Sequence, residues 1–94
     1  MNHWIVIFRD APEMQAVREK HFADHVAYLT SQPHIFVDGT SLAPEEGTAP
    51  VGGMWIVQAD DRKDIVTLIE GDPMFKSGHR DYEIFATGKQ LSTS

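Results

Sequence analysis

The sequence contains no cysteine, and this absence excludes disulfide bonds and thiolate metal ligands from its 94 residues. A chain without cysteine is compatible with a reducing compartment, so we expect a cytoplasmic protein. The sequence also has no apolar run close to the roughly 18 residues that a membrane-spanning helix needs. Its first eight residues, MNHWIVIF, lack the basic start of a secretory signal.

Positive charge is scarce: 8 lysine and arginine residues stand against 14 aspartate and glutamate residues, for a formal net charge of -6. Such a surface repels nucleic acid and anionic membranes, and no basic cluster offsets it, so we expect neither as a partner. Hydrophobic residues make up 41% of the chain, which favours a folded domain. Because a domain of this length has a thin core, we expect a homodimer.

The residue pattern predicts one α+β domain over residues 1–94, with the element order β-α-β-β-α-β. Short apolar runs predict strands at residues 4–8, 34–37, 54–59 and 80–86, with Asp38-Gly39 closing the second strand and a loop over residues 42–53. This order is ferredoxin-like: a four-stranded antiparallel sheet with two helices on one face. The other face then needs cover, which a second copy supplies.

The first predicted helix extends from Glu13 to about Gln32, with Asp10 available to cap it. At about 100° per residue, one arc of it carries most of the apolar side chains. These are Met14, Val17, Phe22, Val26, Tyr28 and Leu29. Asp60 or Asp61 can cap the second helix, and Gly71 stops it in the manner of a C′ glycine.

Two histidines on the first helix, His21 and His25, are candidates for chemistry because both fall on its apolar arc. An inward imidazole tends to be neutral and available as a base, although a histidine at such a position is more often a hydrogen-bonded core residue. The spacing also fits two ligands of one metal ion. The glutamate of the zinc-protease motif is missing, however, and no cysteine supplements the pair, so we expect no metal.

Asp72-Pro73 after the second helix is the other candidate. One interpretation is architectural, since an aspartate before proline commonly bonds nearby backbone N–H groups in a turn. The other is functional: a rigid turn holds the carboxylate where it reaches the first helix and forms an acid/base pair with a histidine. Sequence spacing alone leaves both open.

Three segments of the chain resemble the YciI-like family. The run His25-Val26-Ala27-Tyr28-Leu29 is similar to a helix segment in which a histidine precedes an apolar-Ala-Tyr-Leu run. Residues 53–61, GMWIVQADD, look like the third strand and helix cap of that family. Residues 72–78, DPMFKSG, match its pattern of Asp-Pro, four residues and Gly. The three occur in order and with matching spacing.

The resemblance implies a subunit of a dimeric α/β barrel, in which two sheets meet face to face, and a site built on a histidine and an aspartate. At the matching positions these are His25 and Asp72, with His21, Tyr28, Trp55 and Gly78 expected around the substrate and no cofactor. Some relatives remove halide from lactones formed during degradation of chlorinated aromatics. Related domains also occur fused to regulatory proteins.

The sequence departs from the family pattern in places. Phe22 stands where an arginine usually precedes the histidine by three residues, and Arg18 precedes His21 by that distance, so His21 is the rival for the family histidine. We prefer His25 because Ala-Tyr-Leu follows it. The usual Gly-Pro and Pro-Phe pairs are replaced by Gly39-Thr40 and Ala86-Thr87.

Two functional hypotheses follow from these residues. The first is a cofactor-independent acid/base enzyme of lyase, isomerase or dehalogenase type, in which His25 and Asp72 act on a small cyclic or aromatic-derived metabolite. The second is a dimeric module that binds a small molecule or regulates a partner without catalysis.

Overall fold

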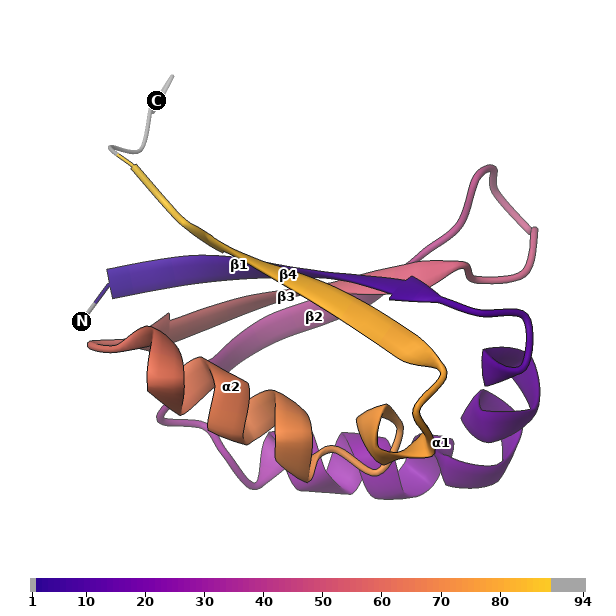
Figure 1. Ribbon diagram of the computed structural model, residues 1–94, viewed down its shortest axis with the longest axis horizontal. Coiled ribbons are helices and arrows are strands. Elements are labelled where there is room, and N and C mark those ends of the chain that lie inside the picture. Colours follow the sequence, from indigo (N-terminus) through magenta and orange to yellow (C-terminus); the bar gives the residue numbers. More distant parts are fainter. Residues whose placement is uncertain (1, 89–94) are drawn as a thin grey trace.

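The computed structural model describes residues 2–88 and has an antiparallel four-stranded sheet with both helices packed on one face (Figure 1). The elements are β1 (Asn2–Asp10), α1 (Met14–Thr30), β2 (Phe36–Leu42), β3 (Gly52–Ala59), α2 (Arg62–Gly71), the short 3-10 helix η1 (Phe75–Ser77) and β4 (Arg80–Ala86). The strands lie in the order β2-β3-β1-β4, which confirms the predicted ferredoxin-like α+β fold.

The core lies between the sheet and the helices, and the strand pattern explains why. Successive side chains of a strand point to opposite faces, so Val6 and Phe8 of β1 face the helices and are at most 1% exposed. On α2, Ile65, Leu68 and Ile69 recur at helical spacing and meet them. Burying each such side chain stabilises the fold by about 1.5–3 kcal/mol.

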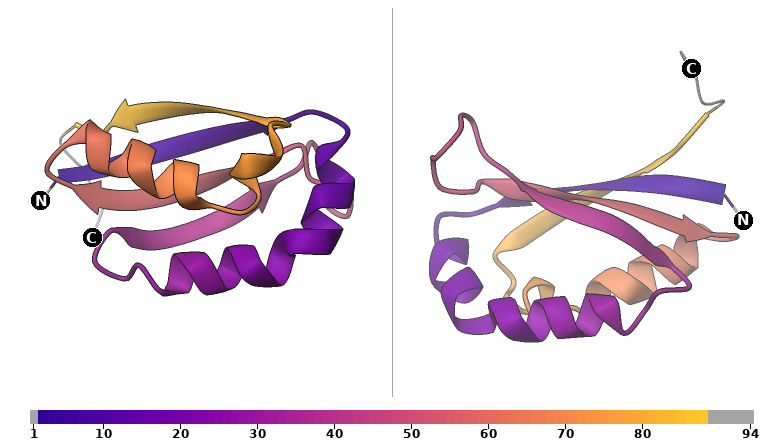
Figure 2. Two further views of the ribbon diagram at one scale, coloured as in Figure 1. Left: turned by 60° about the horizontal axis from the view of Figure 1, so that its bottom comes forward. Right: turned by 180° about the vertical axis from the view of Figure 1, so that it is seen from behind.

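Helix α1 buries less than its predicted arc. Met14 and Leu29 are buried, but Phe22 remains 56% exposed and Val26 41% exposed. Both border a cavity between α1 and the sheet, and they face open space there instead of packed side chains. The two views of Figure 2 show α1 running beneath the β2 side of the sheet, where this space lies.

The second and third strands differ from their predicted bounds. Strand β2 begins at Phe36 and continues through Asp38-Gly39, which the sequence pattern had placed at its end. A register shift between Phe36 and Asp38 and the edge position of β2 let this pair of residues stay in the ladder with β3. Strand β3 begins at Gly52, which pairs with Arg9 of β1, and only glycine fits there because a Cβ would lie 2.0 Å from the carbonyl oxygen of Phe8.

The predicted roles of two residues at helix ends are also wrong, although α2 does stop at Gly71. Asp10 does not cap α1; its carboxylate accepts hydrogen bonds from Arg18 and Arg80, and the N-cap residue is Glu13. Gly71 is not a left-handed C′ residue but the last residue of α2, where a Cβ would lie 2.2 Å from the Tyr28 hydroxyl oxygen. Glycine is needed there because α1 approaches closely. Asp61 does cap α2, as predicted, and accepts from the Lys63 N–H.

The face of the sheet away from the helices carries an apolar patch. Its members come from β1, β3 and β4 and alternate with the core residues of those strands. They are Ile5, Ile7, Met54, Ile56 and Phe85, and we call this set the open-face patch. Phe85 is 48% exposed. Among residues 2–88, none of the helices has the length and apolar character to cross a membrane.

Candidate active site

The imidazole of His25 on α1 lies against the carboxylate of Asp72, which follows α2. The Nδ1 atom of His25 is 2.8 Å from Oδ1 and 2.7 Å from Oδ2 of Asp72. The Asp72 side chain is 0% exposed and that of His25 is 13% exposed. The predicted contact between a histidine of α1 and the carboxylate of Asp72 is therefore present. The histidine that makes it is His25 and not His21.

The turn at Asp72-Pro73 fixes this carboxylate. Oδ1 of Asp72 accepts a hydrogen bond from the backbone N–H of Met74 at 3.0 Å, and the Asp72 carbonyl accepts from the N–H groups of Phe75 and Lys76. The same carboxylate thus holds the turn and contacts the histidine. Asp72 therefore has the backbone hydrogen bond of a turn-forming aspartate and also the histidine contact that an acid/base pair requires.

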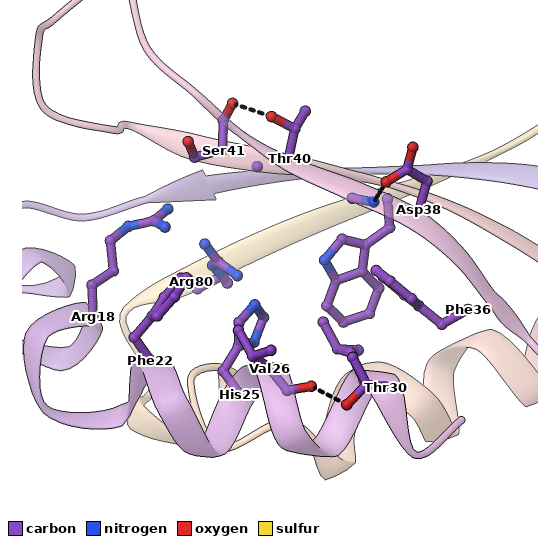
Figure 3. Close-up of a pocket in the computed structure, with 14 residues that line it drawn as sticks. Arg18, Phe22, His25, Val26, Thr30, Phe36, Asp38, Thr40, Ser41 and Arg80 are labelled. Carbon is purple, nitrogen blue, oxygen red and sulfur yellow. Dashed lines mark hydrogen bonds between the residues drawn. The ribbon is translucent and has the colours of Figure 1, made fainter. Parts of the chain in front are cut away.

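The contact selects one tautomer of His25. An ionised carboxylate only accepts hydrogen bonds, so the neutral imidazole carries its proton on Nδ1 and leaves a lone pair on Nε2. Among residues 2–88, no group bonds Nε2 and no buried side-chain nitrogen or oxygen lacks a partner. Nε2 is therefore accessible, and Figure 3 shows the ring of His25 rising from the helix into the cavity.

The cavity beside His25 has a volume of about 300 Å³ and opens between α1, β2 and β3. Aromatic side chains form much of its wall. The ring of His25 lies 6.2 Å from that of Phe22 and 6.3 Å from that of Trp55, and Phe36 meets Trp55 edge-on at 5.7 Å. This volume is at the small end for ligand sites, and the apolar walls suit a single small ring.

One end of the cavity is cationic. Arg18 donates from Nη2 to Oδ2 of Asp10 at 2.7 Å and to the Gly52 carbonyl at 2.9 Å. Arg80 donates to both carboxylate oxygens of Asp10, at 2.6 and 3.1 Å. Burial by itself raises the pKa of the Asp10 carboxyl, but the hydrogen bonds and charges of Arg80 and Arg18 outweigh it and lower that pKa below its ordinary value.

No prediction from the sequence placed Arg18, Arg80 or Asp10 at the site. Arg18 precedes His25 by seven residues, two helical turns, so the shared helix face was a usable signal. The pairing of Asp10 with Arg80 depends on β1 lying beside β4, where the two residues are register partners. Which strand lies beside β1 depends on the order of strands in the sheet, and no local sequence pattern predicts it.

The other predicted site residues lie in different places. Trp55 lines the cavity, as expected, whereas His21, Tyr28 and Gly78 do not. His21 lies near Asp24 on the outer part of α1, 4.0 Å from its carboxylate. Gly78 ends η1 at the other side of the turn, with a φ of 80°.

Tyr28 connects the two helices. Its hydroxyl donates to the Leu68 carbonyl at 2.8 Å, and burial together with the nearby Asp72 charge raises its pKa. The residue that we expected beside the substrate therefore borders a separate hollow between the helices. Within the described residues, no three histidine, aspartate or glutamate side chains gather closely enough to hold a metal ion.

The structure is a ferredoxin-like α+β domain with a cavity between α1 and the sheet. The chain belongs to the YCII-related domain family, whose sequence pattern matches residues 2–87. This match confirms the family that the three sequence segments indicated.

Solved structures with the same fold include a dehydrochlorinase. The structure of 5-chloro-2-hydroxyhydroquinone dehydrochlorinase (TftG) from Burkholderia phenoliruptrix AC1100, in complex with 2,5-dihydroxybenzoquinone, matches with a TM-score of 0.76 and 22% identity over 98% of this chain and 95% of that one. An ethyl tert-butyl ether degradation (EthD) family protein from Bacillus halodurans C-125 matches with a TM-score of 0.51 and 18% identity, covering 97% and 100%.

A third structure, a point mutant of SnoaB, a cofactor-independent oxygenase from Streptomyces nogalater, matches with a TM-score of 0.51 and 18% identity over 98% and 96% of the two chains. At these identities the likeness establishes the fold. No curated protein matches the sequence.

Proposed function

We propose that the protein is a cofactor-independent acid/base enzyme that acts on a small cyclic or aromatic-derived metabolite, with His25 as the proton-transferring group. The observation that carries the proposal is the His25–Asp72 contact beside an aromatic-walled cavity. A buried carboxylate on Nδ1 leaves Nε2 as the atom that meets a substrate.

The reaction begins when Nε2 of His25 accepts a proton from a C–H or O–H group of the bound ring. Asp72 is a positioning residue in this step: it fixes the ring orientation and stabilises the positive charge that the imidazole acquires. The same Nε2 then returns the proton to another atom of the substrate or to water. The buried side chain of Trp55 gives the substrate ring an apolar wall.

The comparison with the dehydrochlorinase supports this reaction class. Dehydrochlorination removes a proton and a chloride ion together, so its balance requires no oxidant or reductant. A positioned base is the protein group that such an elimination needs. We extend that class of chemistry to this chain, and the dehydrochlorinase's substrate serves below as a probe for it.

We further propose that the active form is a cytoplasmic homodimer whose sheets meet through the open-face patch. This patch is apolar and lies opposite the helices, and its side chains keep partial exposure in the single chain. Exposed contiguous apolar surface of this kind is typical of an interface. In such a dimer the His25 cavities lie on the outer, helix-bearing sides.

The enzymatic proposal is tested by measuring deuterium exchange at ring carbons and the release of chloride. Hydroxyhydroquinone and 5-chloro-2-hydroxyhydroquinone are incubated with the protein in deuterated water, and NMR follows deuterium incorporation and chromatography follows chloride. We expect catalysis by the unaltered protein and a loss of about 10²–10⁴ in rate in His25→Gln. Asp24→Asn, an exposed change on the same helix, is the matched control.

Equal rates for the unaltered protein and the His25→Gln variant would contradict the proposal. Binding of either compound with no turnover at any pH would instead identify the non-catalytic binding module.

A further inference from the structure

We propose that Arg18 and Arg80 form an anion-binding end of the His25 cavity, so that its ligand is a small ring compound carrying one anionic oxygen group, a carboxylate or an ionised hydroxyl. The inference deepens the proposed function and rests on it for the orientation of the ring toward His25. The negative charge of the ligand is inferred from the two arginines alone.

The charges at this end do not cancel. Two guanidinium groups meet one carboxylate, that of Asp10, within hydrogen-bond distance. The Arg80–Asp10 pair is nearly fully buried, with both side chains 2% exposed, whereas Arg18 is 16% exposed and supplies the excess positive charge. A local charge of this sign stands out in a chain whose formal net charge is -6. It favours an anion at that place.

Both arginines also have unused donors. Arginine has five N–H groups. Arg18 uses Nη2 for Asp10 and Gly52, and Arg80 uses Nε and Nη2 for Asp10, which leaves Nη1 of each without an acceptor among residues 2–88. Because no buried side-chain nitrogen in the described part of the chain lacks a partner, these groups are accessible. Both residues line the cavity.

The two guanidinium groups are held in place before any ligand binds. Asp10 joins them, and Arg80 also stacks on the ring of Phe8, with its Cζ 4.6 Å from the ring centroid. A donor that is already oriented loses little conformational freedom when an anion arrives. Charge-assisted hydrogen bonds to such donors are about twice as strong as neutral ones.

The rest of the cavity sets the direction of the ligand. Figure 3 shows Arg18 and Arg80 on one side of His25 and Phe36 and Asp38 on the other. The far end is apolar: Phe36 lines it, whereas Asp38 pairs with Ile56 and therefore turns its carboxylate to the open face of the sheet, where Oδ1 accepts from the Gly39 N–H. Arg18 and His25 are seven residues apart, about 10 Å along the helix axis. A single ring with one anionic substituent bridges that span once both side chains reach inward.

Binding of benzoate and its neutral isostere benzamide tests the charge requirement. The probes are titrated into the full chain at low salt and followed by the indole N–H signal of Trp55 in proton–nitrogen correlation spectra. Trp4 is an internal reference because its indole N–H donates to the Ala59 carbonyl, away from the cavity lining. We expect benzoate to bind about tenfold or more tightly than benzamide, with the difference shrinking as salt is added.

Arg18→Gln removes the excess charge and the Arg18–Asp10 ion pair but leaves both hydrogen bonds from Arg80 to Asp10, and we expect it to reduce the preference for benzoate to about twofold or less. Arg18→Lys restores part of the preference. Lys20→Gln makes the same change in net charge at an exposed position of the same helix and leaves the preference unchanged. Thermal unfolding of each variant checks that the fold is intact.

Equal affinity for the two probes, no binding of either, or an unchanged preference in Arg18→Gln would each overturn the inference. 4-Nitrophenolate serves as the ionised-hydroxyl probe: tighter binding than benzoate assigns the site to hydroxyl-derived anions, and weaker binding assigns it to carboxylates. The His25→Gln variant separates this inference from the proposed function. Retained anion preference in a variant that shows no loss of catalysis supports the anion site while refuting the proton-transfer role of His25.

Discussion

Replacing Asp72 by asparagine tests how the carboxylate controls the histidine. Oδ1 of Asp72 accepts from the Met74 N–H, and this requirement survives the substitution. The amide oxygen of the new side chain is therefore retained at Met74, and its NH₂ group turns toward Nδ1 of His25. Because an NH₂ group donates, Nδ1 must become the acceptor and the ring proton moves to Nε2. The nitrogen that faces the cavity then loses its basic lone pair.

The expected change in stability is modest. A hydrogen bond to a charged group contributes about 1.5–3 kcal/mol and a neutral one about 0.5–1.5 kcal/mol, so Asp72→Asn lowers the free energy of unfolding by about 1 kcal/mol. Asp72→Ala should cost more, because it also leaves the Met74 N–H unpaired, a further loss of about 1–3 kcal/mol. Asp24→Asn, with 74% of its side chain exposed, should change stability by less than about 0.5 kcal/mol.

Nitrogen-15 NMR of the imidazole at alkaline pH measures the tautomer directly, and urea unfolding measures stability. We expect Nδ1–H in the unaltered protein and Nε2–H in Asp72→Asn. A ring that keeps its proton on Nδ1 in that variant would refute the reasoning. So would a ring that shows the Nε2–H form in the unaltered protein.

Three further predictions concern the frame of the site. Gly71→Ala should lower the free energy of unfolding by about 1–2 kcal/mol, since its Cβ displaces the Tyr28 hydroxyl from the Leu68 carbonyl. In a protein that already carries Tyr28→Phe, Gly71→Ala should cost less. A double-mutant cycle by urea unfolding measures the coupling energy between the two residues. The lowered pKa of Asp10 means that the ionised carboxylate stabilises the fold fully above its ordinary value of 3.8 and loses this contribution as the pH falls through the lowered value. The stability gap between the unaltered protein and Asp10→Asn, about 3 kcal/mol at neutral pH, should therefore close only in strong acid, and a gap independent of pH would contradict the ion pair. The unaltered protein should sediment as the proposed homodimer in analytical ultracentrifugation, and Ile56→Asp on the open-face patch should convert it to a monomer, with Asp60→Asn as the control; an unchanged dimer would place the interface elsewhere.

The elements that local pattern controls were predictable from the sequence. The order of strands and helices follows from apolar periodicity, and β4 has the predicted bounds of Arg80–Ala86. The errors arose where a long-range contact overrides a local signal. Asp38-Gly39 is a turn pair by composition, but pairing with β3 keeps it in a strand. Gly71 looks like a helix stop, but its bare Cα makes room for Tyr28.

The site divides in the same way. The turn at Asp72 and the inward face of His25 could be inferred from neighbours in the chain. The choice between His21 and His25 could not, because it depends on how far α1 is rotated over the sheet. Arg80 and Asp10 lie 70 residues apart and meet through the β1–β4 register, which a single sequence does not reveal.

The double role of Asp72 has a consequence for comparing this chain with its homologues. A descendant that abandoned catalysis would still require an acceptor for the Met74 amide, so selection for folding alone could preserve the aspartate. Its retention in another member of the family is accordingly poor grounds for inferring an active enzyme. The histidine opposite carries no such structural duty in the turn, and its loss or survival is the more informative record of whether chemistry has been kept.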